Sequence, residues 1–185
     1  MERYINAPID DEIVKTLEAG DFVYISGTIY TARDAAHKRM YESMLEGKEI
    51  PIDLKNNIIY YLGPTPAREG QVIGSAGPTT SSRMDKYTPL MLKKGLKGMI
   101  GKGKRSEEVI KTMQGEGAVY FAAIGGAGAL LSKCITKAEV IAYDDLGTEA
   151  IRRLEVKKLP VIVVIDSKGN NLYEEAIEKY KCIAK

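Results

Sequence analysis

Residues 98–124, GMIGKGKRSEEVIKTMQGEGAVYFAAI, contain the pattern that decides the fold class of this chain. A short strand is predicted at Gly98–Ile100, and a helix follows over Ser106–Met113, where two acidic residues in the first turn favour a helix N-terminus. The apolar run Ala118–Ile124 then predicts a buried strand. Strands that alternate with helices in this way are typical of an α/β domain.

The same alternation extends to both sides of this stretch. Further strands are predicted at Asp21–Gly27, Asn57–Leu62, Ala138–Tyr143 and Val161–Asp166. Further helices are predicted at Thr31–Gly47, Arg83–Lys94, Gly126–Ser132 and Gly147–Arg153. The other segments are a lead-in with one helical turn before Gly20, a loop or short strand over residues 63–77, and a terminal helix or tail over residues 174–185. We expect one domain over residues 1–185.

The composition argues against several classes of protein. With 44% hydrophobic and 28% charged residues among 185, the chain resembles an ordinary globular protein, and no apolar run approaches membrane-spanning length. Lysines and acids are mixed along the chain and the net charge is +2, which argues against a nucleic-acid surface. The N-terminus lacks the basic-then-apolar layout of a secretory signal, so we expect a cytoplasmic location.

The chain has few residues that bind metals. Cys134 and Cys182 are its two cysteines, neither lies in a C-x-x-C pair, and His37 is its one histidine. This set cannot supply the ligands of a cubane cluster or a structural zinc ion, so no metal site is predicted here. Cys134 is expected to be a small core residue and Cys182 a thiol of the tail. If the chain works with an iron–sulfur cluster, another subunit must hold that cluster.

Two segments combine a helix-capping pattern with an arginine. In Gly77–Asp85 (GPTTSSRMD), Ser82 and Asp85 have the spacing of a capping box, which would put Arg83 in a first helical turn. Thr31–Asp34 (TARD) repeats the pattern around Arg33. The helix macrodipole disfavours a cation there, and local rules tend to be broken at functional sites. Arginine beside helix N-terminal amides suits a carboxylate or a phosphate, although two surface arginines bridged to neighbouring acids would show the same pattern.

Five segments together resemble one protein family, in its order and over nearly the whole chain. They are GTIYTARDAAHKRM at 27–40, YYLGPTP at 60–66, GPTTSSRMD at 77–85, IGKGKRS at 100–106 and DLGTEAI at 145–151. The chain resembles the β subunit, or C-terminal domain, of the iron–sulfur class I fumarases and L(+)-tartrate dehydratases. The resemblance implies a layered β/β/α domain similar to the swivelling domain of the aconitase group. It also implies an α subunit that holds a [4Fe-4S] cluster through three cysteines, in an α2β2 or similar assembly.

The resemblance also implies roles for single residues. Arg33 and Arg83 match positions that contact a carboxylate of a dicarboxylic acid. Lys102, between two glycines, matches a substrate-binding cation, although a solvent-facing turn lysine would look the same. Thr79 matches the base beside the acidic carbon; the alternative is a turn hydroxyl bonded to its own backbone. Glu149 matches a supporting position.

His37 is a second candidate for proton transfer. It lies three residues after Asp34 on the same predicted helix face, and an Asp–His couple can act as general acid or base near neutral pH. The alternative is an ordinary polar helix residue, and whether His37 transfers the proton or orients a partner stays open. Asp34, Asp85 and Glu149 are expected to support the site.

One glycine-rich segment is assigned no ligand. Gly125–Gly128 follows a predicted strand and resembles a phosphate cradle, but it lacks the dinucleotide fingerprint and a Walker lysine. It is interpreted as tight strand-to-helix packing, with a subunit interface as one reason for it.

The function predicted from these patterns is that of the β subunit of a two-subunit [4Fe-4S] hydro-lyase, inactive without its α subunit. The reaction is the reversible dehydration of a 2-hydroxy dicarboxylate, with malate and fumarate as the first substrate choice and L-tartrate as the second. An alternative is a non-catalytic anion-binding or regulatory α/β module.

Overall fold

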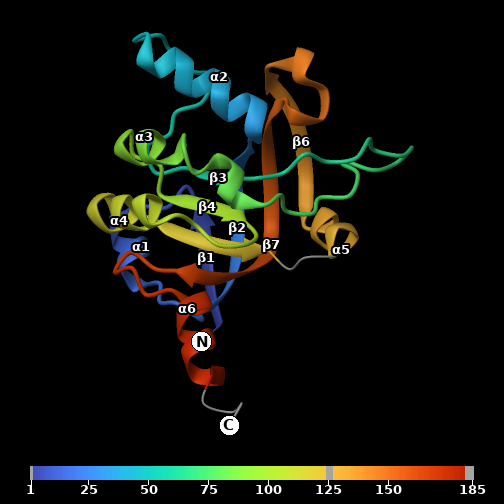
Figure 1. Ribbon diagram of the computed structural model, residues 1–185. Coiled ribbons are helices and arrows are strands. Elements are labelled where there is room, and N and C mark those ends of the chain that lie inside the picture. Colours follow the sequence, from blue (N-terminus) through green and yellow to red (C-terminus); the bar gives the residue numbers. More distant parts are fainter. Residues whose placement is uncertain (1, 124–126, 182–185) are drawn as a thin grey trace.

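A computed structural model describes residues 2–123 and 127–181, and it contains one mixed sheet with helices packed on it (Figure 1). The described strands are β1 (Glu2–Ala7), β2 (Phe22–Thr31), β3 (Ile58–Tyr60), β4 (Gly98–Gly101), β5 (Val119–Ala123), β6 (Ile135–Ala142) and β7 (Ile151–Ile165). The described α-helices are α1 (Asp11–Thr16), α2 (Asp34–Leu45), α3 (Thr88–Lys93), α4 (Glu107–Glu116), α5 (Gly128–Lys133) and α6 (Leu172–Lys181). Two 3₁₀-helices, η1 (Ser81–Met84) and η2 (Asp144–Glu149), lie between them.

The sheet closes on itself. Its strand order is β1-β2-β3-β4-β5-β7-β6, and β2 also pairs antiparallel with β7, from Phe22 opposite Ile162 to Thr31 opposite Arg152. Strands β2, β3, β4, β5 and β7 therefore form a ring of pairings. Neighbours along β2-β3-β4-β5 are parallel, so their carboxyl ends lie at one edge of the sheet.

Alternation along the strands divides the core into two clusters. Ile58 and Tyr60 of β3 face the cluster enclosed by the ring, which also contains residues of β2, β5 and β7. Ile59 and Tyr61 face the opposite cluster, which packs under α2, α3 and α4. Figure 1 shows these three helices stacked along one side of the strands. The strands therefore lie between an inner core and a layer of helices.

The α/β class predicted from the sequence is confirmed, because the chain forms a mixed sheet with helices. The alternation around residues 98–123 is present as β4, α4 and β5, and a terminal helix, α6, occupies Leu172–Lys181. The likeness to the swivelling domain of the aconitase group stays a prediction. Within the described part of the chain, no helix is long and apolar enough to cross a bilayer.

The helix predicted at Gly147–Arg153 is wrong. Residues up to Glu149 form η2, and the chain then enters the 15-residue strand β7 at Ile151. Gly147 has φ 57° and ψ −114°, which ends helical geometry, and β7 is held by antiparallel partners in β2, β5 and β6. These long-range pairings override the local preference for helix.

Strand β7 also begins ten residues before the strand predicted at Val161–Asp166, and its middle explains why. On one edge, β7 pairs with β6 up to Val156 and with β5 from Val161. Pro160, which has no N–H to donate, lies in the gap between these two partners. Strand β1, at Glu2–Ala7, is likewise absent from the sequence prediction, because a polar strand at the sheet edge carries little apolar pattern.

Candidate functional site

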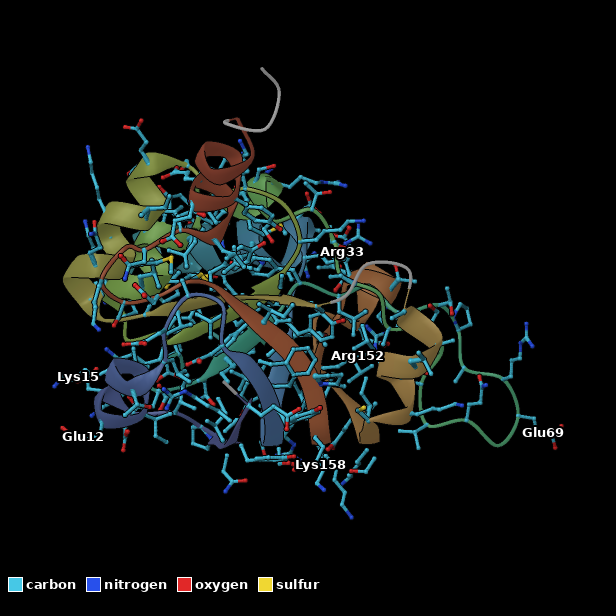
Figure 2. The ribbon with its side chains drawn as sticks, turned by 90° about the horizontal axis from the view of Figure 1, so that it is seen from below. Glu12, Lys15, Arg33, Glu69, Arg152 and Lys158 are labelled. Carbon is cyan, nitrogen blue, oxygen red and sulfur yellow. The ribbon has the colours of Figure 1, made fainter. Side chains whose placement is uncertain are left out.

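The predicted site residues follow three neighbouring parallel strands at their carboxyl ends. Arg33 follows β2, the loop over residues 62–79 follows β3, and Lys102 follows β4. Isolated bridges between Leu62 and Pro78 and between Thr80 and Lys102 join these segments. Figure 2 shows Glu69 at the tip of this loop, which projects away from the body of the molecule. Ligands of α/β proteins bind at this edge of a sheet.

Arg33 and Arg83 converge on the carboxylate of Asp34. Arg83 Nε donates a hydrogen bond to Asp34 Oδ1 at 2.6 Å, and Arg33 Nε lies 3.8 Å from Asp34 Oδ2. Arg33 Nη2 lies 3.4 Å from Glu149 Oε1. The Arg83 side chain is 54% exposed, and among the described residues only its Nε has a partner, so its two amino groups face solvent.

The backbone of Gly63 is pressed against Arg33. A Cβ added at Gly63 would lie 2.6 Å from Arg33 Nη1, so no larger residue fits while the guanidinium keeps its place. The loop that begins at Gly63 therefore packs against one side of the site formed by Arg33, Arg83 and Asp34.

The capping box expected around Arg33 is wrong. Thr31 is the last residue of β2, and its Oγ1 accepts a hydrogen bond from the Arg152 N–H at 3.1 Å. Helix α2 begins at Asp34, with Arg33 as its N-cap residue and no cap from the Arg33 side chain. Glu149 accepts the Ala35 N–H at 2.8 Å instead. Glu149 therefore binds both the helix N-terminus and Arg33.

The capping box at Ser82 and Asp85 is also wrong. The chain forms the short η1 there, and α3 begins only at Thr88, with Pro89 in its first turn. Ser82 is exposed, and Asp85 binds another segment: it accepts hydrogen bonds from Arg105 Nε and from the Ser106 N–H, both at 2.7 Å. Asp85 thus joins η1 to the start of α4.

Thr79 and Lys102 lie on adjacent backbones. The Thr79 N–H donates to the Tyr61 carbonyl at 2.7 Å, and the Thr79 residue is half-buried. Ser81 binds both backbone polar groups of Lys102. Its Oγ accepts the Lys102 N–H at 3.1 Å, and its own N–H donates to the Lys102 carbonyl at 2.9 Å. A Cβ on Gly101 would collide with Ser81 Oγ, so this approach requires glycine. The Lys102 side chain is exposed.

His37 is fully buried, and its ring is bonded to the backbone rather than to Asp34. Nδ1 donates to the Arg33 carbonyl at 2.9 Å, and the ring meets Tyr61 edge-on at 5.2 Å. Burial lowers the pKa of His37 to about 4, so the imidazole is neutral at pH 7. The coupling of His37 to Asp34 that the spacing predicts is therefore not a hydrogen bond here.

Buried polar atoms without a partner gather in the first turn of α2. Among the described residues, the atoms with this property are Arg33 Nε, Asp34 Oδ2 and His37 Nε2. Buried polar atoms are normally paired, and exceptions often mark functional sites. The first turn of α2 is the place where this structure leaves hydrogen-bonding capacity unused.

The buried state of His37 predicts a stability change with pH. The unfolded chain takes up a proton on His37 below pH 6.5, whereas the folded chain keeps the ring neutral down to about pH 4. The free energy of unfolding should therefore fall as the pH drops through this window, by at most about 3 kcal/mol, so the fold becomes less stable. His37→Asn, whose amide can replace Nδ1–H, should flatten the pH dependence of urea-unfolding midpoints between pH 6.5 and 4. An unchanged slope would show that His37 titrates alike in both states.

The other predicted groups lie apart from this site. Within the described residues, no set of three His, Cys, Asp or Glu side chains is arranged to hold a metal ion. Cys134 is only partly buried and packs against the margin of the inner core instead of within it, and Cys182 lies outside the described residues. Gly125 and Gly126 also lie outside them, and α5 begins at Gly128.

Sequence reasoning missed Arg105, whose side chain has 0% exposure. It belongs to the segment IGKGKRS, but nothing in that segment separates a buried cation from the exposed lysines beside it. Its partner Tyr61 directly follows β3 and its partner Tyr120 lies in β5, and only the fold brings these two strands to Arg105.

Comparison with known proteins shows the family of this chain. A family model described as "Fumarase C-terminus" matches residues 3–176. A Methanocaldococcus jannaschii protein named "Putative L(+)-tartrate dehydratase subunit beta" is 41% identical over 172 residues, which cover 90% of this chain and 88% of that protein. The Escherichia coli "Fumarate hydratase class I, anaerobic" is 39% identical over 157 residues, covering 84% of this chain and 29% of its own. The Leishmania major "Fumarate hydratase 1, mitochondrial" is 41% identical over 153 residues, covering 82% and 28%. The chain thus spans under a third of the two fumarate hydratases.

Proposed function

The chain belongs to the fumarase C-terminus family, and from this premise we propose that it is the β subunit of a two-subunit hydro-lyase. The reaction is the reversible removal of water from a 2-hydroxy dicarboxylate. Malate and fumarate are the first substrate pair, and L-tartrate is the second. The names of the relatives support both choices. We place the enzyme in the cytoplasm and treat residues 1–185 as one domain.

One observation carries this proposal: two arginines, 50 residues apart in the sequence, converge on one carboxylate at the edge of the parallel strands. Asp34 holds both guanidiniums beside each other while the amino groups of Arg83 stay free in solvent. A planar guanidinium can bind a carboxylate through two hydrogen bonds. In this proposal Arg33, Arg83 and Lys102 bind the two carboxylates of the substrate, and Asp34 and Glu149 orient the arginines.

The proton-transfer step is assigned to Thr79. In dehydration, the proton beside a carboxylate leaves its carbon, the C–H electron pair becomes the second bond of the alkene, and hydroxide leaves the neighbouring carbon. A threonine hydroxyl is a poor base unless nearby positive groups stabilise its alkoxide. Lys102 is bridged to Thr80, the residue after Thr79, so it brings a cation to this segment. His37, buried and neutral, supports the arginine segment through the Arg33 carbonyl.

The residues of this chain do not fit an iron–sulfur cluster. A cubane is held by cysteine thiolates, and the chain has two cysteines, of which Cys134 packs against the core. We propose that an α subunit holds the [4Fe-4S] cluster and that the assembly is α2β2 or similar. The exposure of Arg83 and Lys102 on an open surface supports a site that a partner completes.

Purification should separate this proposal from its alternatives. The chain alone should contain no stoichiometric iron or sulfide after anaerobic reconstitution, because it lacks the ligands. Co-expressed with its α subunit, it should form a complex with a cubane spectrum that dehydrates malate or L-tartrate. A stable cubane on the lone chain would refute the two-subunit assignment. A complex that binds dicarboxylates without turnover would favour the non-catalytic module.

A further inference from the structure

Arg105 is buried inside the helix-covered core and bonded on every side. Its Nε donates to Asp85 Oδ1 at 2.7 Å, Nη2 donates to Thr88 Oγ1 at 2.9 Å, and Nη1 donates to the Tyr61 hydroxyl at 3.3 Å. Its guanidinium carbon lies 5.3 Å from the ring centre of Tyr61 and 5.0 Å from that of Tyr120. The side chain has no exposure to solvent.

Two partners of Arg105 lie on or beside segments that carry proposed site residues. Asp85 directly follows η1, which contains Arg83. Tyr61 accepts the Thr79 N–H with its carbonyl. Arg105 itself lies three residues after Lys102. One guanidinium therefore connects the segment of Thr79 and Arg83, the chain end of β3 at Tyr61, and the turn that follows Lys102.

Tyr120 extends this connection to the backbone of the Lys102 turn. Its hydroxyl donates to the Gly103 carbonyl at 2.9 Å, and it lies 2.9 Å from Ser81 Oγ. Because that hydroxyl has a single hydrogen, Ser81 Oγ must donate to it, and Ser81 Oγ in turn accepts the Lys102 N–H. The result is a closed path of hydrogen bonds from the Lys102 N–H, through Ser81 and Tyr120, to the Gly103 carbonyl.

We propose that Arg105 is a positioning residue that sets the spacing between Arg83 and Lys102, and so the distance between the two substrate carboxylates. A buried cation is costly, and apolar side chains of similar size often replace one without loss of stability. An apolar side chain, however, cannot donate hydrogen bonds to several segments at once, whereas the planar guanidinium of Arg105 does so in a fixed geometry. This inference rests on the proposed function, because the spacing matters only if both cations bind one substrate.

The test compares a ligand with two carboxylates and a ligand with one. In the co-purified complex, inhibition constants for succinate and acetate are measured for wild type, Arg105→Lys and Arg105→Met. Succinate must span both cations, so its affinity should fall roughly 10-fold or more in both variants, because a shift of about 1 Å has large effects on such geometry. Acetate needs one cation, so its affinity should stay within about twofold.

The ratio of the two constants separates positioning from stability. A variant that merely unfolds in part loses affinity for both ligands equally, and a succinate-to-acetate ratio equal to that of wild type would overturn the inference. Arg3→Lys is the matched control, since Arg3 pairs with the buried Asp21 in the β1–β2 region, and it should leave the ratio unchanged. A wild-type complex that neither turns over nor binds succinate would refute the proposed function instead.

Discussion

Arg83→Lys in the assembled enzyme is expected to lower kcat/KM roughly 10²-fold or more, and Arg33→Lys is expected to do the same. Lysine keeps the charge but loses the planar fork that holds Asp34 with one edge and can bind a carboxylate with another. The Arg83→Lys variant should also bind dicarboxylate inhibitors more weakly, because the amino groups of Arg83 are free for a ligand. Steady-state kinetics of the purified complex measure both effects.

Two further variants make this test specific. Gly63→Ala keeps both arginines in the sequence, but its methyl group would lie 2.6 Å from the present position of Arg33 Nη1 and so displaces that guanidinium; it should reproduce part of the loss without removing a charge. Arg153→Lys changes an exposed arginine paired with Glu139 on the β6–β7 hairpin and should leave kinetics unchanged. Wild-type kinetics in both Arg33→Lys and Arg83→Lys would mean that these arginines only bridge neighbouring acids.

For Arg33 and Arg83, the sequence predicts the location of the site but not the local structure around each arginine. A capping pattern predicts each arginine in a first helical turn, yet neither Thr31 nor Ser82 caps a helix. The residues nevertheless meet, because β2 and β3 are parallel neighbours and the segments after them share one edge of the sheet. The positions were therefore predictable from the alternation of strands and helices, but the contacts of Asp34 were not.

Elements with strong local signals were predicted well. Helix α4 begins after Ser106, whose Oγ accepts the Val109 N–H, and it ends at Gly117 in the left-handed conformation. The first ten residues of strand β7 were not predicted because much of their pairing is with β2, which lies more than 100 residues earlier in the sequence. Arg105 was missed for the same reason: one buried cation among 27 lysines and arginines is identified by its tertiary neighbours.

Thr79→Val should abolish turnover while the complex still assembles and still binds a dicarboxylate inhibitor. Valine keeps the shape of the side chain and removes the hydroxyl, and the Thr79 N–H bond to the Tyr61 carbonyl is unaffected. Exchange of the carbon-bound proton of the substrate with solvent, followed by NMR in deuterium oxide, should vanish as well. That step needs the base itself, whereas binding needs only the cations.

His37→Asn is the matched variant, and the structure sharpens what it should do. A fully buried, neutral imidazole whose Nδ1 donates to the Arg33 carbonyl serves the backbone of that segment, so we expect the variant to retain proton exchange. It should instead raise KM, because the Arg33 segment loses part of its support. If the histidine variant loses exchange and the threonine variant keeps it, the two roles are reversed. If both lose it and the double variant loses no more than either single one, the two residues act as one unit.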